Sequence, residues 1–347
     1  MIEMEIQGSV GILTLNRLKA YNALSVEMIL SLFNTLKAWQ HDKKVQAVVI
    51  RSASNDVFCA GGDIKALYHY REEPVEQLMV FFEHEYQLDY LLQVYPKPII
   101  SLLNGATMGG GVGIGMHNRF AIAGENIVFA MPETAIGLFP DIGSSHLLNQ
   151  LPNAWRNSVG VFGTRLYLNE LLAFGLLHAY IPTASWNAFL KELIETNWSQ
   201  DPFKDVEHLI TKFKQAVGAY QEPCEEFWRF DADSFVQLMK NIDEANTDYF
   251  YSLKDAMTKL CPLSMYVTFE KLKLSQGMDL GECLQLDYQL LYHFMSQSDF
   301  FEGVRALLID KDKHPHWSYP DWESIPFSVL QSYFYPKVDL KLNLSMV

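Results

Sequence analysis

The chain has 347 residues, of which 49% are hydrophobic and 20% charged, a composition that excludes disordered, collagen-like and coiled-coil proteins. Lys and Arg number 27 against 41 Asp and Glu, which gives a formal net charge of −14. This charge disfavours nucleic acid and anionic membranes as partners, because both are bound largely through basic residues. It leaves a small anionic ligand open, since backbone N–H groups and a few local cations can bind one.

The cysteines and the start of the chain indicate the cellular compartment. Four cysteines lie far apart without the spacing of a metal site or a disulfide framework, so we expect free thiols (Cys59, Cys224, Cys261 and Cys283). The acidic first residues resemble no leader peptide, and no apolar run approaches the roughly 18 residues of a membrane span. We therefore predict a cytoplasmic protein, with a processed mitochondrial chain as the less favoured alternative.

The first 200 residues alternate between strand and helix patterns. Residues 5–16 alternate around Gly8 and Gly11 as a hairpin does, and residues 25–39 have helical periodicity behind the capping residue Ser25. Further strands are predicted over 45–51, 98–103, 120–123 and 127–131, a helix over 76–94, and a glycine-rich helix start over 109–119. Repeated strand, strand, helix units predict an α/β fold.

Beyond residue 200 the pattern becomes helical. Helices are predicted over 205–220, 234–246, 252–260, 264–274 and 280–297. This shift in composition divides the chain into residues 1–200, which we expect to carry the active site, and a mainly helical region over 201–347.

Two glycine-rich turns follow predicted strands. Gly61 and Gly62 lie within 57–65, and six glycines lie within 104–115. Such turns can present backbone N–H groups to an anion, although glycines serving only a tight turn or close helix packing remain the alternative. Neither segment matches a dinucleotide-binding or phosphate-binding loop motif.

Three carboxylates lie in apolar surroundings. Glu133 and Asp141 belong to an apolar, proline-bounded segment over 129–143, and Glu85 lies on the apolar stripe of the helix over 76–94. Burial makes such groups candidates for acid–base chemistry or substrate binding, with a capping or ion-paired carboxylate as the alternative. No ligand cluster accompanies His314 and His316, so no metal site is predicted, and the motifs of serine hydrolases and zinc proteases are missing from the sequence.

Four segments, in this order and spacing, resemble the enoyl-CoA hydratase/isomerase (crotonase) superfamily: 15–24, 58–65, 104–115 and 131–137. The longer string over 131–141, together with 301–317, resembles the 3-hydroxyisobutyryl-CoA hydrolase branch of that superfamily. The resemblance implies a crotonase-like spiral of ββα units followed by a helical C-terminal region.

The resemblance also assigns roles to residues. It implies an oxyanion hole made of the backbone N–H groups of Gly62 and Gly110, with Glu133 acting on the thioester carbonyl as a general base or a nucleophile. Asp141 would hold the substrate hydroxyl or orient Glu133. Glu85 would help to bind the acyl part, and the CoA part would run along Lys19, Ala20, Asn22, Asp63, Ile64 and Lys65.

The implied activity is hydrolysis of 3-hydroxyisobutyryl-CoA, and of 3-hydroxypropionyl-CoA, to the free hydroxy acid and CoA in valine breakdown. Hydratases of the superfamily carry a second catalytic glutamate where this chain has Gly113, which disfavours enoyl hydration. Coenzyme A is part of the substrate, no separate cofactor is expected, and a homo-oligomer is possible in this family. The alternatives are a hydratase or isomerase acting on another acyl-CoA, and a non-catalytic subunit. Leu18 and the pair Ser144-Ser145 depart from the family pattern, and the pair lies beside the site.

Overall fold

The computed structural model describes residues 1–335, 340–345 and 347, and its strands form two sheets. The larger sheet has the order β1-β2-β3-β5-β7-β9, and the smaller one the order β4-β6-β8. Only the N-terminal hairpin of the larger sheet is antiparallel, and the other pairings in both sheets are parallel. The strands are β1 (Ile2–Gln7), β2 (Val10–Leu15), β3 (Ala47–Ser52), β4 (Val57–Cys59), β5 (Ile99–Leu103), β6 (Ala106–Met108), β7 (Phe120–Ala123), β8 (Val128–Ala130) and β9 (Ala179–Tyr180).

The chain winds between the two sheets as a spiral. Each of β3, β5 and β7 in the larger sheet is followed by a strand of the smaller sheet. Helices complete these units: α1 (Val26–His41), α2 (Ile64–His69), α3 (Val75–Val94), α4 (Gly110–Met116), α5 (Ser144–Leu148), α6 (Asn153–Phe162) and α7 (Leu168–Ala173). The predicted spiral of ββα units is confirmed, and so is the Ser25 cap, whose side chain accepts from the N–H of Met28.

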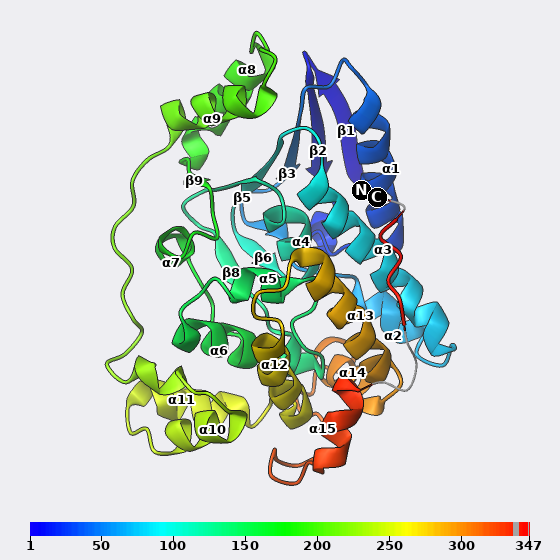
Figure 1. The fold of residues 1–347 in the computed structure, drawn as a ribbon, viewed down its shortest axis with the longest axis vertical. Helices are drawn as coiled ribbons and strands as arrows, with labels where there is room; N and C mark the ends of the chain where they lie inside the picture. Colours follow the sequence, from blue (N-terminus) through cyan, green and yellow to red (C-terminus); the bar gives the residue numbers. More distant parts are fainter. Residues whose placement is uncertain (336–339, 346) are drawn as a thin grey trace.

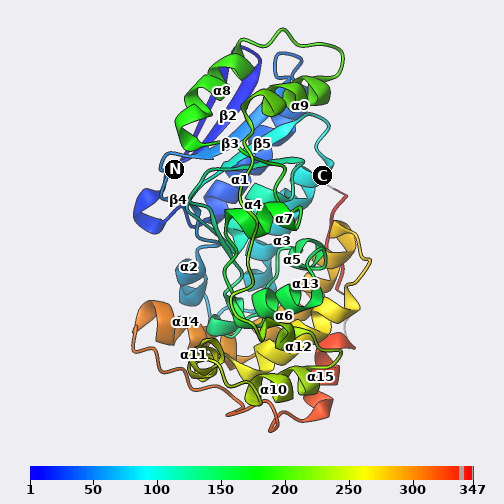
Figure 2. The ribbon, with the colours of Figure 1, turned by 90° about the vertical axis from the view of Figure 1, so that its left-hand side faces the viewer.

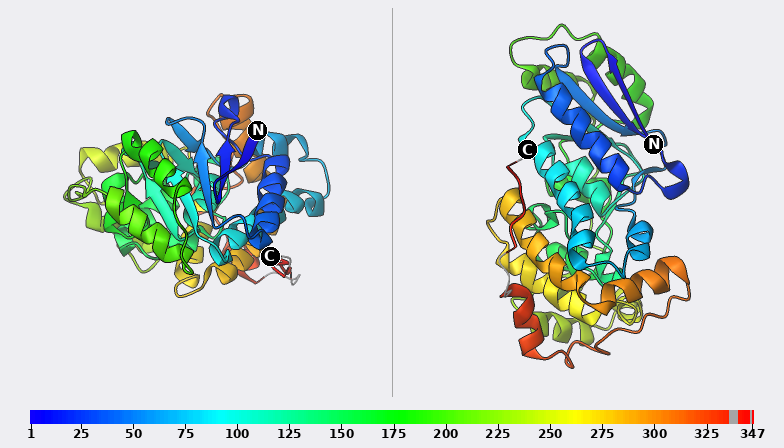
Figure 3. Two further views of the ribbon diagram at one scale, coloured as in Figure 1. Left: turned by 90° about the horizontal axis from the view of Figure 1, so that it is seen from above. Right: turned by 90° about the vertical axis from the view of Figure 1, so that its right-hand side faces the viewer.

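The two faces of the larger sheet pack against different helices. Side chains alternate along β3, so Val48 and Ile50 join the core on the side of α1 and α3, whereas Val49 joins a smaller core on the other side. Helices α8 (Trp186–Ile194) and α9 (Pro202–Phe213) cover that second face (Figure 3, right). The sheet is therefore buried on both faces, as parallel sheets require.

The C-terminal helices lie at the end of the molecule opposite the hairpin of β1 and β2 (Figures 1 and 2). They are α10 (Phe235–Asp243), α11 (Asp248–Met257), α12 (Pro262–Leu274), α13 (Leu280–Met295), α14 (Ser298–Val304) and α15 (Phe327–Phe334). Helix α13 packs on α3, and α12 packs on α6. One apolar core contains both Leu24 and Leu290, so the helical region continues the core of the spiral.

Short helical turns complete the described chain: η1 (Leu18–Ala20), η2 (Glu133–Ile136), η3 (Thr183–Ser185), η4 (Phe227–Phe230) and the π-helix η5 (Arg305–Ile309). Two details differ from the sequence prediction. The helix expected over 205–220 ends at Phe213, because Lys214 is extended, and β6 occupies part of the segment expected to be a glycine loop. Among the described residues, no helix is long and apolar enough to cross a bilayer.

Candidate active site

A cavity of about 820 Å³ lies where the spiral meets the C-terminal region. Its wall comes from η1, the turn before α2, the start of α4, η2 and the π-helix η5. Ten of the eleven residues predicted for the site line it: Lys19, Ala20, Gly62, Asp63, Ile64, Lys65, Glu85, Gly110, Glu133 and Asp141. Residues that are far apart in the sequence are thus brought to one cavity.

Two backbone amides converge in this cavity. The N–H groups of Gly62 and Gly110 donate to no backbone or side-chain acceptor among the described residues. A Cβ built on Gly110 would lie 3.3 Å from the nitrogen of Gly62, which shows how closely the two turns approach. The preceding glycines, Gly61 and Gly109, have φ values of +109° and +48°, which side chains rarely allow. The geometry suits an oxygen that gains negative charge.

Two glutamates reach the same turn. A Cβ on Gly110 would lie 2.1 Å from Oε1 of Glu85, and a Cβ on Gly109 would lie 3.0 Å from Oε1 of Glu133. Position 110 therefore needs glycine because the Glu85 carboxylate leaves no room for a side chain, whether or not a ligand is bound. Both glutamates consequently lie within reach of a group bound at the two amides.

Glu133 is buried with one carboxylate oxygen free of hydrogen bonds to the described residues. It begins η2 after Pro132, it is 6% exposed, and its Oε2 has no hydrogen-bond partner among the described residues. Burial, followed by the charge of Asp141, raises the pKa of Glu133 well above its usual value. A carboxyl group with a raised pKa is suited to general base catalysis near neutral pH.

Asp141 lies on a turn over 140–143 that several groups hold. The hydroxyl of Tyr86 donates to its Oδ2 at 2.8 Å. Burial and then the charge of Asp287 raise the pKa of Asp141 to about 7, while Tyr86 and Lys271 act in the opposite direction. Asp141 thus changes charge in the physiological range.

The helix α3 contributes a second buried acid that the sequence analysis missed. Asp89 lies one turn after Glu85, and neither of its carboxylate oxygens has a partner among the described residues. A Cβ on Gly113 would lie 2.5 Å from Oδ1 of Asp89. Asp89 therefore fills the space beside Gly113, the position where the resemblance places a glutamate in hydratases. Burial and then Glu85 raise the pKa of Asp89.

The mouth of the cavity carries the residues predicted for CoA. Lys19 and Lys65 are exposed there, and Asp63 caps α2 and pairs with Arg17 at 2.6 Å. Asn22 does not line the cavity, contrary to the prediction. Its side chain is fully buried and bonds to Ser52, Phe58 and the amide of Arg17, so it holds the turn together.

Other lining residues had no role in the sequence analysis. They include Arg17, His69, Phe82, Met108, Leu307 and Leu308. The two leucines belong to the π-helix η5, a rare element that is frequent at functional sites. The match of 301–317 to the family pattern was the available signal, but it did not indicate which side chains would reach the cavity.

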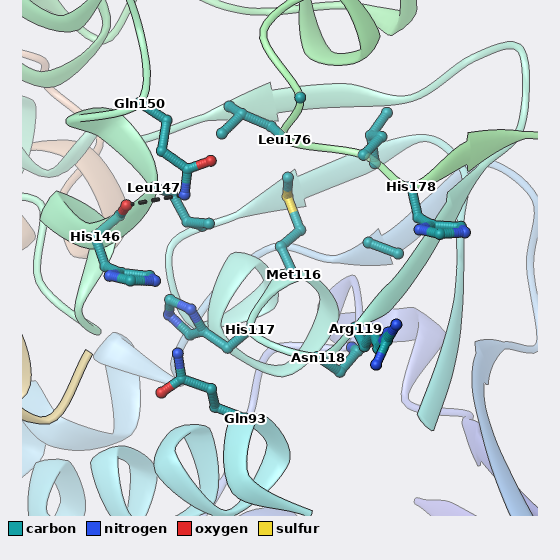
Figure 4. A pocket seen from close by; sticks show the side chains of 13 residues that line it. Gln93, Met116, His117, Asn118, Arg119, His146, Leu147, Gln150, Leu176 and His178 are labelled. Atoms are coloured by element: carbon teal, nitrogen blue, oxygen red, sulfur yellow. Dashed lines mark hydrogen bonds between the residues drawn. The ribbon is translucent and has the colours of Figure 1, made fainter. Parts of the chain in front are cut away.

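A second cavity of about 450 Å³ lies around Gln93, His117 and His146 (Figure 4). Histidines, glutamines and Arg119 line it, and no Asp or Glu of the described part of the chain does. His117 joins the two cavities, because its Nε2 donates to the carbonyl of Ile142 at 2.7 Å. Without carboxylates, this second cavity lacks the chemistry of the first.

The chain is similar over most of its length to known proteins. The sequence profile for enoyl-CoA hydratase/isomerase matches residues 10–334. A Danio rerio protein named "3-hydroxyisobutyryl-CoA hydrolase, mitochondrial" is 34% identical, over 89% of this chain and 83% of the relative. An Arabidopsis thaliana protein named "3-hydroxyisobutyryl-CoA hydrolase 1" is 35% identical, over 95% and 90%.

A solved structure is similar as well. A crystal structure described as an enoyl-CoA hydratase from Rhodobacter sphaeroides superposes with a TM-score of 0.85 at 30% identity, covering 97% of both chains. The zebrafish name assigns that protein to mitochondria, so the cytoplasmic location stays a prediction for this chain.

Proposed function

Because the chain belongs to the enoyl-CoA hydratase/isomerase family, we propose that it is a thioesterase that cleaves 3-hydroxyisobutyryl-CoA to 3-hydroxyisobutyrate and CoA. The observation that carries this proposal is the meeting of Glu133 and Asp141 with two unpaired amides in one cavity, while position 113 is a glycine. The names of the zebrafish and Arabidopsis relatives support the same substrate.

The amides of Gly62 and Gly110 receive the thioester oxygen in this mechanism. When water or a carboxylate adds to the carbonyl carbon, that oxygen becomes an oxyanion between two fixed donors. Loss of one such donor typically costs about 2.7–4 kcal/mol of transition-state stabilisation. The same pair would stabilise an enolate, so the carboxylates determine the reaction.

Glu133 can act on the thioester carbonyl by one of two routes. As a general base it takes a proton from water, which attacks the carbonyl carbon and expels the CoA thiolate. As a nucleophile it displaces the thiolate itself, and water then opens the resulting anhydride. Its unpaired Oε2 and its position beside Gly109 suit both routes.

Asp141 and Glu85 bind the acyl part in this proposal. Asp141, which accepts a hydrogen bond from Tyr86, also accepts one from the substrate hydroxyl or orients Glu133. Glu85 lies beside the Gly110 turn. 3-Hydroxypropionyl-CoA lacks one methyl group, a difference that pockets discriminate by only about 1–3 kcal/mol. We therefore propose it as a second substrate.

The CoA part extends to the mouth of the cavity. Its phosphates would lie near the exposed Lys19 and Lys65, along a wall that includes Ala20, Asp63 and Ile64. We place the reaction in valine breakdown, as the substrate in the relatives' names suggests. The possible homo-oligomer remains a prediction.

Thiol release from a panel of acyl-CoA esters tests the proposal. The panel contains 3-hydroxyisobutyryl-CoA, 3-hydroxypropionyl-CoA, acetyl-CoA and crotonyl-CoA, with the enoyl absorbance of crotonyl-CoA followed in parallel. Release confined to the two 3-hydroxyacyl esters is expected. Loss of enoyl absorbance without thiol release would favour a hydratase, which the description of the Rhodobacter structure makes the second candidate. No change in either channel would favour the non-catalytic alternative.

A further inference from the structure

A buried ion pair joins two C-terminal helices directly beneath the turn of Asp141. Lys271 on α12 and Asp287 on α13 approach to 2.6 Å between Nζ and Oδ1. Their side chains are 1% and 0% exposed. Neither residue belongs to the segments that gave the family resemblance.

Each member of the pair also bonds to the backbone of the turn. The ammonium of Lys271 donates to the carbonyl of Pro140 and lies 4.8 Å from the ring centre of Phe139. Oδ2 of Asp287 accepts from the amide of Gly143 at 2.7 Å. The pair therefore bonds to the backbone of the turn on both sides of Asp141.

The turn needs such support, because its backbone is unusual. Ile142 has a φ of +54°, a conformation that costs free energy for a β-branched side chain, and Gly143 follows with +67°. The imidazole of His117 supports the same stretch from the second cavity through the carbonyl of Ile142. The surrounding contacts thus hold Asp141 in place although the backbone conformation of the next residue is unfavourable.

The pair also sets the charge around Asp141. The titratable groups that face Asp141 or its turn are Glu85, Tyr86, Asp89, His117, Glu133, Lys271 and Asp287. Five carboxyl groups, counting Asp141 itself, thus share one ammonium group. A buried charge of this kind needs a counter-ion nearby, since water cannot stabilise it.

We propose that Lys271 and Asp287 are positioning residues of the active site, which fix the turn over 140–143 with Asp141 facing the cavity, and that Lys271 is the counter-ion of the carboxylates there. This inference rests on the proposed hydrolase function. Stability alone is a weak explanation for the pair, because apolar residues often replace a buried ion pair without loss of stability.

Charge-neutral variants separate this role from a merely structural one. In K271Q the cation is lost, so ionising Asp141 becomes harder and the acid limb of kcat/KM moves up by about one pH unit. In D287N a neighbouring negative charge is lost, and the limb moves down. The double variant K271Q/D287N lies between them, near the wild type. A structural role would lower activity at every pH without opposite shifts.

A second measurement does not depend on hydrolysis. The titration midpoint of the Asp141 carboxyl, followed by 13C NMR in protein labelled at aspartate and assigned with D141N, is expected to shift in the same opposite directions. If the wild type releases no thiol, the proposed function fails while the NMR shifts still test the positioning role. Unchanged midpoints, or shifts in one direction for both single variants, would overturn the inference.

Two further variants complete the experiment. E226Q/R229Q neutralises a half-buried ion pair that does not line the cavity and is expected to leave both the pH profile and the midpoint unchanged. K271M/D287L replaces the pair with apolar side chains of similar volume and loses both contacts to the turn. We therefore expect kcat to fall at least tenfold, in a protein whose circular dichroism is that of the wild type. If K271Q does not fold, the comparison is made between K271Q/D287N and D287N. The titration midpoint of Asp141 must then be higher in the double variant.

Discussion

The closest approach in the active site, between Gly110 and Glu85, leads to a sharp prediction for Gly110→Ala. The new methyl group would lie 2.1 Å from Oε1 of Glu85, whereas ordinary contacts begin near 3.4 Å. Either the carboxylate or the turn must therefore move by more than 1 Å. The Oε1 atom of Glu85 is the end of a side chain that lines the cavity, so the carboxylate can turn into the cavity or the Gly110 turn can shift.

A shift of the turn would move the Gly110 amide away from the thioester oxygen, and a shift of the carboxylate would place it in the space of the acyl group. Misplacement of a catalytic group by about 1 Å costs on the order of 100-fold, and loss of an oxyanion donor about 100-fold to 1000-fold. We expect kcat for 3-hydroxyisobutyryl-CoA to fall by about two orders of magnitude, with a smaller change in KM because the CoA wall is untouched.

Steady-state thiol release and circular dichroism measure the two relevant quantities. The matched control is Gly218→Ala, since a Cβ there meets only the amide nitrogen of Asn169 at 3.9 Å, and it should retain wild-type activity. A folded Gly110→Ala enzyme with kcat within threefold of the wild type would refute the assigned role of the amide.

Three other substitutions test the carboxylates. Glu133→Gln should lower kcat by about 10²-fold to 10⁴-fold, and a loss under threefold in thiol release would contradict its role. Tyr86→Phe removes a hydrogen bond that lowers the pKa of Asp141, so the acid limb of kcat/KM should rise by about one to two pH units, equal to about 1.5–3 kcal/mol; an unmoved limb would count against it. Burial raises the pKa of Asp89, so the folded state keeps a proton that the unfolded state loses above about pH 4, and stability falls as pH rises. In Asp89→Asn the free energy of unfolding should fall less steeply with pH, by up to about 1.4 kcal/mol per pH unit. Urea unfolding at pH 5 and pH 8 measures this difference, which should be missing if Asp89 is ionised in the folded state.

Local features of the site could be predicted from the sequence. Gly61, Gly62 and the glycines of 104–115 indicated turns that could present backbone N–H groups, and the apolar surroundings of Glu133 indicated burial. Most strands of the larger sheet followed from the same patterns, because each of them is set by residues close together in the chain.

The rest depends on contacts between distant segments. Tyr86 reads as one more aromatic residue of an apolar helix, and only the packing of α3 against the turn reveals its bond to Asp141. Lys271 lies in a predicted helix, and the sequence does not indicate that it is buried. Asn22 was expected to bind substrate, but its side chain donates hydrogen bonds to Ser52 and Phe58 and is buried away from the cavity.

The origin of the cavity walls has a consequence for the order of events during synthesis. The glycine turns and Glu133 leave the ribosome first, but Asp287 follows about 150 residues later and Leu308 about 20 residues after that. At typical rates of about 5–20 residues per second, the nascent spiral waits roughly ten seconds or more for its last wall. A chain interrupted before Leu308 would therefore hold all of its reactive groups and no finished acyl-CoA site, so we expect hydrolysis to begin only once synthesis has passed Leu308 and the chain has folded.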